Sequence, residues 1–128
     1  MATIKSFTDI NQSRKLAEIL PFESADMWWL YITAQGKYIA MMHDEPDPHY
    51  LVRMESYGIK DAAIRCWSLA ALLGVLPYPS LHKTFSGWRC DSYDKEGTMK
   101  TCRLGENADN PVDACYEMII RLNELNLL

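Results

Sequence analysis

Apolar and polar positions alternate most clearly near the end of the chain, where their spacing predicts a helix over residues 111–125. Asn110 as the cap, Pro111 in the first turn and Asp113 after it are typical of a helix start. Apolar side chains then recur on one side of the helix, at Val112, Cys115, Tyr116, Ile119, Ile120 and Leu122. The pattern therefore predicts one buried face and one wet face.

Two earlier helices are predicted from caps and stops. Thr8 is the expected cap of a helix over residues 9–20, which Pro21 ends. Ser68 is the expected cap of a helix over residues 69–76. Because that sequence is apolar on all sides, we expect it to be the most buried element of the fold.

Strand patterns lie between these helices. Residues 27–32 and 38–42 are rich in aromatic and β-branched side chains, and Gly36 in the loop between them suits a tight turn, so a hairpin is predicted. Both strands are apolar at nearly every position, which indicates that protein or an interface covers each face. Three further strands are expected at residues 81–85, 88–93 and 99–104. Cys90 and Asp91 lie on opposite faces of the middle strand, of which one is core and the other is wet.

The segment from His43 to Lys60 shows neither the apolar spacing of a helix nor the alternation of a strand. It is acidic and contains two prolines, so we expect a long mobile loop with one short strand at residues 50–54. Loops of this length inside compact domains are uncommon unless they are functional or disordered. The segment is therefore a candidate site from its position alone.

The order of these elements predicts an α+β fold. An N-terminal helix and a hairpin are followed by a helix, three antiparallel strands and a helix, and all of them share one core. The 128 residues, of which 48% are apolar and 23% charged, contain no evident linker, so residues 1–128 are expected to form a single domain. The second half has the αβββα order of double-stranded RNA-binding domains.

Charge weighs against that analogy. The net charge is −4, and the expected start of the last helix at Asn110 carries no Lys or Arg before Arg121, so nucleic acid is not the expected partner. The chain has no apolar run long enough to span a bilayer, and its start lacks the features of a secretory signal. We therefore expect a cytoplasmic protein that does not enter a membrane.

Cysteine and histidine usage indicates no catalytic centre. Cys66, Cys90, Cys102 and Cys115 are widely spaced and read as buried thiols, with Cys90 and Cys102 on neighbouring strands. A nucleophilic site would need an activated Ser or Cys with a base, for which His82 and Cys90 are the nearest candidates, and no nucleophile elbow or glycine-rich loop is present. We expect no catalytic residue and no cofactor.

Two groups of residues are candidates for binding. His43, Asp44, Glu45, Asp47 and His49 contain the side chains that a divalent metal needs, but a proline-containing acidic stretch is more typical of a solvated contact loop, and no metal is expected. Trp28 and Trp29 are adjacent in a strand and must point to opposite faces, so one of them either lies under a second layer or is an exposed interface anchor.

Three phrases of the chain resemble a known group of proteins. They are Lys15-Leu-Ala-Glu-Ile-Leu-Pro21, Trp67-Ser-Leu-Ala-Ala-Leu-Leu73 and Asn110-Pro-Val-Asp-Ala-Cys-Tyr-Glu-Met-Ile119. They resemble small proteins of gut bacteria, of their prophages and of other mobile elements. The phrases are capping and core motifs, so the resemblance implies a genomic context and no activity.

Three functions follow as hypotheses. The leading one is a non-enzymatic protein–protein interaction module whose partner is another protein, with a homodimer through the first hairpin as a second option. The alternative is a nucleic-acid-binding accessory domain, suggested by the element order. The third is a small metal- or thiol-dependent enzyme.

Overall fold

The structure is a computed structural model that describes residues 5–42, 45–93, 96–101 and 107–128. The chain forms two compact units. The hairpin unit is Asp9–Trp67, and the C-terminal unit is Met1–Thr8 together with Ser68–Leu128. Each unit has a helix packed on a three-stranded antiparallel sheet, which confirms the α+β class. The single domain over residues 1–128 stays a prediction.

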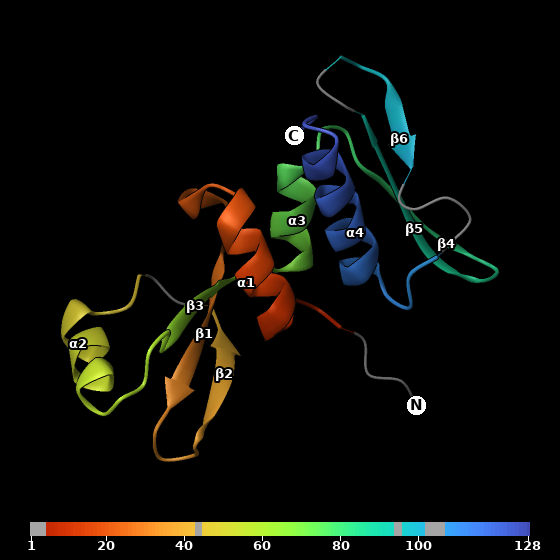
Figure 1. Cartoon of the computed structure of the whole chain (residues 1–128). Coiled ribbons are helices and arrows are strands. Elements are labelled where there is room, and N and C mark those ends of the chain that lie inside the picture. Colours follow the sequence, from red (N-terminus) through yellow and green to blue (C-terminus); the bar gives the residue numbers. More distant parts are fainter. Residues whose placement is uncertain (1–4, 43–44, 94–95, 102–106) are drawn as a thin grey trace. The chain divides into compact units, whose positions relative to one another are not determined.

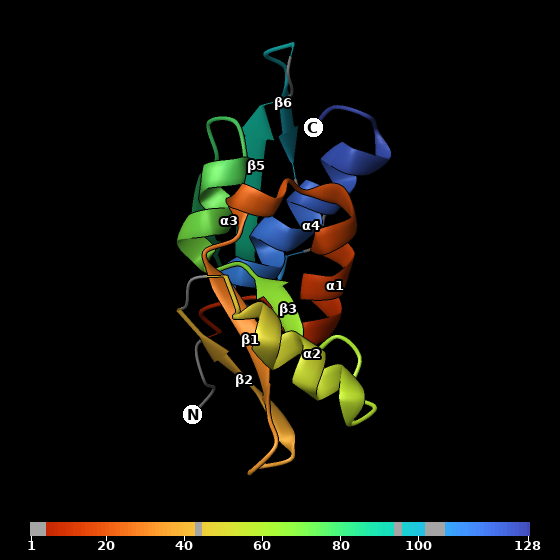
Figure 2. The same cartoon turned by 90° about the vertical axis from the view of Figure 1, so that its left-hand side faces the viewer.

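The hairpin unit is built around strand β1. In chain order it contains α1 (Ile10–Ile19), a short 3-10 helix (Phe22–Ser24), β1 (Met27–Ile32), β2 (Lys37–Met41), α2 (Pro48–Ser56) and β3 (Ala63–Cys66). The strand order is β2-β1-β3 with both pairings antiparallel, and α1 packs against β3 (Figures 1 and 2). The predicted first hairpin is therefore confirmed.

Helix α1 begins with a capping box, one residue later than the sequence pattern predicts. The side chain of Asp9 accepts the backbone N–H of Gln12 at 2.8 Å, and the side chain of Gln12 accepts the N–H of Asp9 at 3.1 Å. The prediction of Thr8 as the cap was wrong, because Asp9 supplies the stronger reciprocal pair. The helix ends at Ile19, shortly before Pro21.

Helix α2 replaces the middle half of the loop predicted between residues 43 and 60, and the strand predicted at residues 50–54 was wrong. Asp47 caps the helix by accepting the N–H of His49 at 2.9 Å, and Pro48 occupies the first turn. At the other end, Gly58 has a φ of +81°, and the N–H groups of Gly58 and Ile59 close back on the last turn. Residues of the same segment thus cap both ends of α2.

The C-terminal unit contains the predicted order of helix, three strands and helix. Its elements are α3 (Leu69–Val75), β4 (Ser80–Thr84), β5 (Gly87–Tyr93), β6 (Met99–Thr101) and α4 (Pro111–Glu124). The sheet order is β4-β5-β6, α4 packs against β5, and α3 packs against α4. Residues 102–104, which complete the last predicted strand, lie outside the described residues. Gly87 begins β5 with a φ of +144°, and a Cβ there would meet the backbone of Ala108.

Helix α4 provides most of the core of this unit. The side chain of Asn110 accepts the N–H of Asp113 at 2.8 Å, as the cap signal predicts. The fully buried side chains of the helix include Val112, Cys115, Met118, Ile119 and Leu122. Asn126 ends the helix with a φ of 56°, a left-handed conformation that asparagine tolerates.

Helix α3 is less buried than its composition predicts. Only Leu72 is fully buried within it, whereas Ala70 and Gly74 are exposed. The prediction that this would be the most buried element was wrong, because a seven-residue helix packs by one side even when all sides are apolar. None of the helices in the described ranges has the length and apolar character needed to span a membrane.

Candidate protein-contact surface

The two outer strands of the hairpin unit each have backbone groups that point away from the sheet. The N–H of Tyr31 donates to the carbonyl oxygen of Ala62 at 2.8 Å, which makes Tyr31 and Ala62 a hydrogen-bonded pair of the β1–β3 ladder. Hydrogen-bonded and non-hydrogen-bonded pairs alternate in antiparallel ladders. This one pair therefore determines the direction in which the backbone N–H and C=O groups of all the remaining sheet residues point.

On strand β2, the backbone groups of Tyr38 and Ala40 face outward. Trp28 and Leu30 direct their N–H and C=O groups toward β2, where they pair with Met41 and Ile39. The intervening Tyr38 and Ala40 therefore point theirs away from β1, on the side where the described sheet has no further strand.

The side chains of β2 are unusual for an edge strand. Tyr38, Ile39, Ala40 and Met41 are all half-buried, Met42 beyond them is 69% exposed, and the single charge of the strand is Lys37 at its start. Natural edge strands are commonly protected by central charges, prolines or bulges. The outer edge of β2 has none of these in its middle.

Three tyrosines fix the position of this edge. The rings of Tyr31 and Tyr38 pack edge to face, with centroids 5.3 Å apart. The hydroxyl of Tyr38 donates to the carbonyl oxygen of Asp61 at 2.9 Å, and the hydroxyl of Tyr50 donates to the carbonyl oxygen of Tyr31. Burial, and then the neighbouring Tyr38, raise the pKa of the Tyr50 phenol. The hairpin, α2 and the start of β3 are thereby joined.

Trp28 and Trp29 lie on opposite faces of β1, as adjacent strand residues must. Both are half-buried. Trp28 packs edge to face on Phe22, with ring centroids 6.0 Å apart, and shares its face of the sheet with Arg65. The two buried residues of β1, Met27 and Leu30, also lie on opposite faces, so each face of the strand is covered in part.

The acidic segment is divided by the structure. Asp47 is the cap of α2, and His49 is exposed in the first turn of that helix, while His43 and Asp44 lie outside the described residues. No group of three or more Cys, His, Asp or Glu side chains suited to a metal is present in the described part of the chain. The capping hydrogen bond gives Asp47 a structural role.

A polar cluster on the outer face of β4 and β5 was not anticipated. The Nε2 atom of His82 lies 3.1 Å from Oδ2 of Asp91, and Nε of Arg89 lies 3.1 Å from Oδ1 of the same carboxylate. Ser80 Oγ lies 3.4 Å from Nδ1 of His82. Asp91 is buried, and its hydrogen-bonding partners His82 and Arg89 make that burial tolerable.

The thiol of Cys90 faces the core, not this cluster. Leu81 pairs with Cys90 and His82 pairs with Arg89, so His82 and Cys90 project to opposite faces. A hydrogen bond with Cys115, followed by burial, strongly raises the pKa of the Cys90 thiol. This environment opposes the thiolate that a nucleophile requires. Cys102, the neighbour predicted for Cys90, lies outside the described residues.

The first turn of α4 carries an ion pair. Nζ of Lys5 lies 2.8 Å from Oδ1 of Asp113, and the amide of Asn110 donates to the other oxygen of that carboxylate. The start of α4, where double-stranded RNA-binding domains place basic residues, thus presents an acidic side chain whose charge Lys5 balances.

Comparison with known proteins identifies no relative of the chain. No protein-family model, no curated protein and no solved structure matches the chain. The hypotheses about its function therefore depend on the residues themselves.

Proposed function

We propose that the chain is a non-enzymatic protein–protein interaction module that pairs through strand β2 with a second copy of itself. The observation that carries the proposal is the outer edge of β2, where Tyr38 and Ala40 present backbone hydrogen-bonding groups along a strand with no central charge. The resemblance to small proteins of prophages and mobile elements adds a genomic context to this proposal and no activity.

The positions of the outward groups define one symmetric register. An antiparallel pair centred on Ile39 would place Tyr38 of each copy opposite Ala40 of the other, and both of these pairs would be hydrogen-bonded. The two sheets of three strands would then form one continuous sheet of six.

The side chains are compatible with that register. Ile39 would face its own counterpart in a non-hydrogen-bonded pair, the closest type of cross-strand contact. Each Tyr38 would pack beside the small Ala40, and each Lys37 would lie opposite Met41, at the ends of the pair. No like charges are therefore brought together.

Ala40→Pro tests the dimer. The N–H of Ala40 points away from β1, so proline removes a group needed for the new pairing without removing a bond from the hairpin. In sedimentation equilibrium over about a hundredfold range of concentration, the wild type is expected to dimerise and Ala40→Pro to stay monomeric.

Ala63→Pro is the matched control, because it makes the same change on the opposite edge of the sheet and should still dimerise. Ile39→Lys, which would place two like charges face to face, provides a second route to the monomer. A wild-type protein that is monomeric at the highest concentration would refute the β2 dimer.

One observation favours a second function, a nucleic-acid-binding accessory domain. The C-terminal unit has the αβββα order of double-stranded RNA-binding domains. The Lys5–Asp113 pair weighs against it, because the charge of Lys5 at the start of α4 is already balanced by Asp113 and is not available to phosphates. A gel-shift series at low salt with duplex RNA and duplex DNA decides between the two, and no retardation at micromolar protein would eliminate this candidate.

A further inference from the structure

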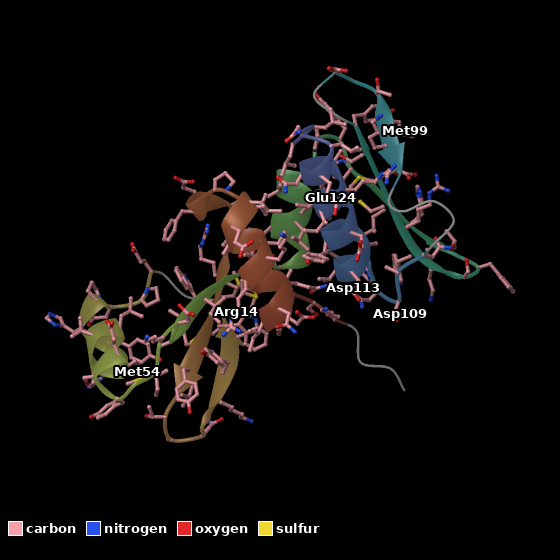
Figure 3. All side chains as sticks on the ribbon, in the orientation of Figure 1. Arg14, Met54, Met99, Asp109, Asp113 and Glu124 are labelled. Carbon is pink, nitrogen blue, oxygen red and sulfur yellow. The ribbon has the colours of Figure 1, made fainter. Side chains whose placement is uncertain are left out.

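The second edge of the same sheet is strand β3, and two hollows meet along it. The first, of about 390 Å³, lies between β3 and α1 and is lined by Arg14, Ala17 and Glu18 of the helix and by Trp28 on the sheet. Arg14 lies on α1 in Figure 3. The second, also about 390 Å³, is lined by Leu51 and Glu55 of α2 and by Ile59. Asp61 and Ala63 line both hollows, which therefore adjoin at the start of β3.

The two adjoining hollows together are called the trough. At two residues of β3 within it, the backbone N–H and C=O groups point away from β1. Ile64 and Cys66 belong to the hydrogen-bonded pairs with β1, so the alternation directs the N–H and C=O groups of Ala63 and Arg65 away from β1. No strand pairs with this side of β3 among the residues that the structure describes. Two donors and two acceptors, spaced as in a strand, thus lie at the hollow beside α1.

We propose that this trough binds an extended peptide segment of another protein, which adds to β3 as a fourth strand. An outward pattern of alternating N–H and C=O groups matches a β-strand backbone. The inference depends on the proposed class, a protein-interaction module, and is independent of the β2 dimer.

The rim of the trough is held in place by contacts of Arg65. The guanidinium group of Arg65 donates to the carbonyl oxygen of Ala17 at 2.9 Å and lies over the rings of Phe22 and Trp67, at 5.3 and 5.4 Å from their centroids. α1 is thereby fixed beside β3. A preformed edge lowers the conformational cost of binding.

The side chains of the trough indicate which peptides it favours. Leu51 and Ile59 give the hollow between α2 and β3 an apolar lining, which suits one aliphatic or aromatic side chain. The charged groups of the lining are balanced, with Arg14, Lys60 and Arg65 opposed by Glu18, Glu55 and Asp61. The trough therefore selects an extended backbone with an apolar anchor, and not a strongly acidic or basic segment.

The probe that tests this is a displayed library of random peptides of about twelve residues, selected on the full-length wild-type protein. Enriched peptides are expected to bind Ala63→Pro at least about tenfold more weakly, because proline removes the outward N–H of Ala63. They should bind Ala40→Pro with unchanged affinity, since that variant alters the other edge. Circular dichroism of both variants verifies that they are folded.

Amide hydrogen exchange of the wild-type protein measures peptide binding at β3 without any variant. Addition of an enriched peptide should slow exchange of the Ala63 and Arg65 amides and leave the Tyr38 and Ala40 amides unchanged. The proposal is overturned if no peptide is enriched, if enriched peptides bind Ala63→Pro as tightly as the wild type, or if protection falls elsewhere. Each of these outcomes is distinguishable from failure of the β2 dimer, which sedimentation measures.

Discussion

The guanidinium group of Arg65 donates a hydrogen bond of 2.9 Å to the carbonyl oxygen of Ala17, a residue near the end of α1. The last carbonyl oxygens of a helix have no partner within the helix, so a donor from elsewhere in the fold satisfies one of them. The second contact of Arg65, 3.5 Å to the carbonyl oxygen of Leu20, is at the limit of a hydrogen bond. One side chain thus ends a helix and attaches it to an edge strand.

Arg65→Lys is expected to destabilise the protein by about 1–3 kcal/mol, because lysine keeps the charge but not the planar donor set that binds Ala17 between two rings. Chemical denaturation provides the measurement. Arg14→Lys, a substitution of an exposed arginine on α1, is the control and should change stability by less than about 0.5 kcal/mol. Equal stabilities for the two variants would show that the Arg65 contacts contribute little.

Asp91→Ala is expected to lower the free energy of unfolding by about 1 kcal/mol, because the hydrogen bonds of Asp91 with His82 and Arg89 are lost while water reaches these two half-exposed side chains. Asp109→Ala removes an exposed carboxylate and is the matched control. Urea denaturation followed by tryptophan fluorescence measures both. A loss no larger than that of the control would mean that the buried carboxylate has no net effect on stability.

The Tyr50 hydroxyl makes stability depend on alkaline pH. Its pKa in the folded protein is raised above the ordinary 10.0, so the unfolded chain releases the proton first as the pH increases. The stabilisation is therefore complete below about pH 10 and declines as the pH rises through the folded pKa. Stability of the wild type should accordingly approach that of Tyr50→Phe above pH 10. A constant difference between the two proteins across this range would contradict the assignment.

Cys90 and Cys115 should resist alkylation in the folded protein. Both thiols are fully buried, and their hydrogen bond together with burial raises the pKa of Cys90, so little thiolate is available near neutral pH. Iodoacetamide labelling followed by peptide mass spectrometry is expected to modify both only after denaturant is added. Rapid labelling of Cys90 without denaturant would revive the thiol-enzyme hypothesis.

Local signals account for what could be predicted from the sequence. Asn110, Pro111 and Asp113 define a helix start by their own chemistry, and the start was correct. Asp47 and Pro48 carry the same signal for α2, yet the acidic and proline-rich surroundings favoured a loop. That helix could have been found. β3 is harder, since four residues of mixed character give no usable period.

The candidate surfaces could not be predicted, because they depend on which strands are at the edges of the sheet. Nothing in the sequence of β2 distinguishes it from a central strand, and its apolar pattern suggested cover on both faces. The outward orientation of Ala63 follows only from its register with Leu30. The contact between Cys90 and Cys115 likewise depends on how β5 meets α4, which no local pattern encodes.

The placement of the two proposed contacts on opposite edges of one sheet makes the assembled protein bivalent. A dimer through β2 would carry one peptide trough at each end of its six-stranded sheet, with the two bound peptides roughly 34 Å apart, since seven spacings of about 4.8 Å separate them. A partner with two binding segments joined by a linker of at least about ten residues could occupy both at once. Its avidity would then exceed the affinity of either segment alone, and that gain would disappear in the Ala40→Pro monomer.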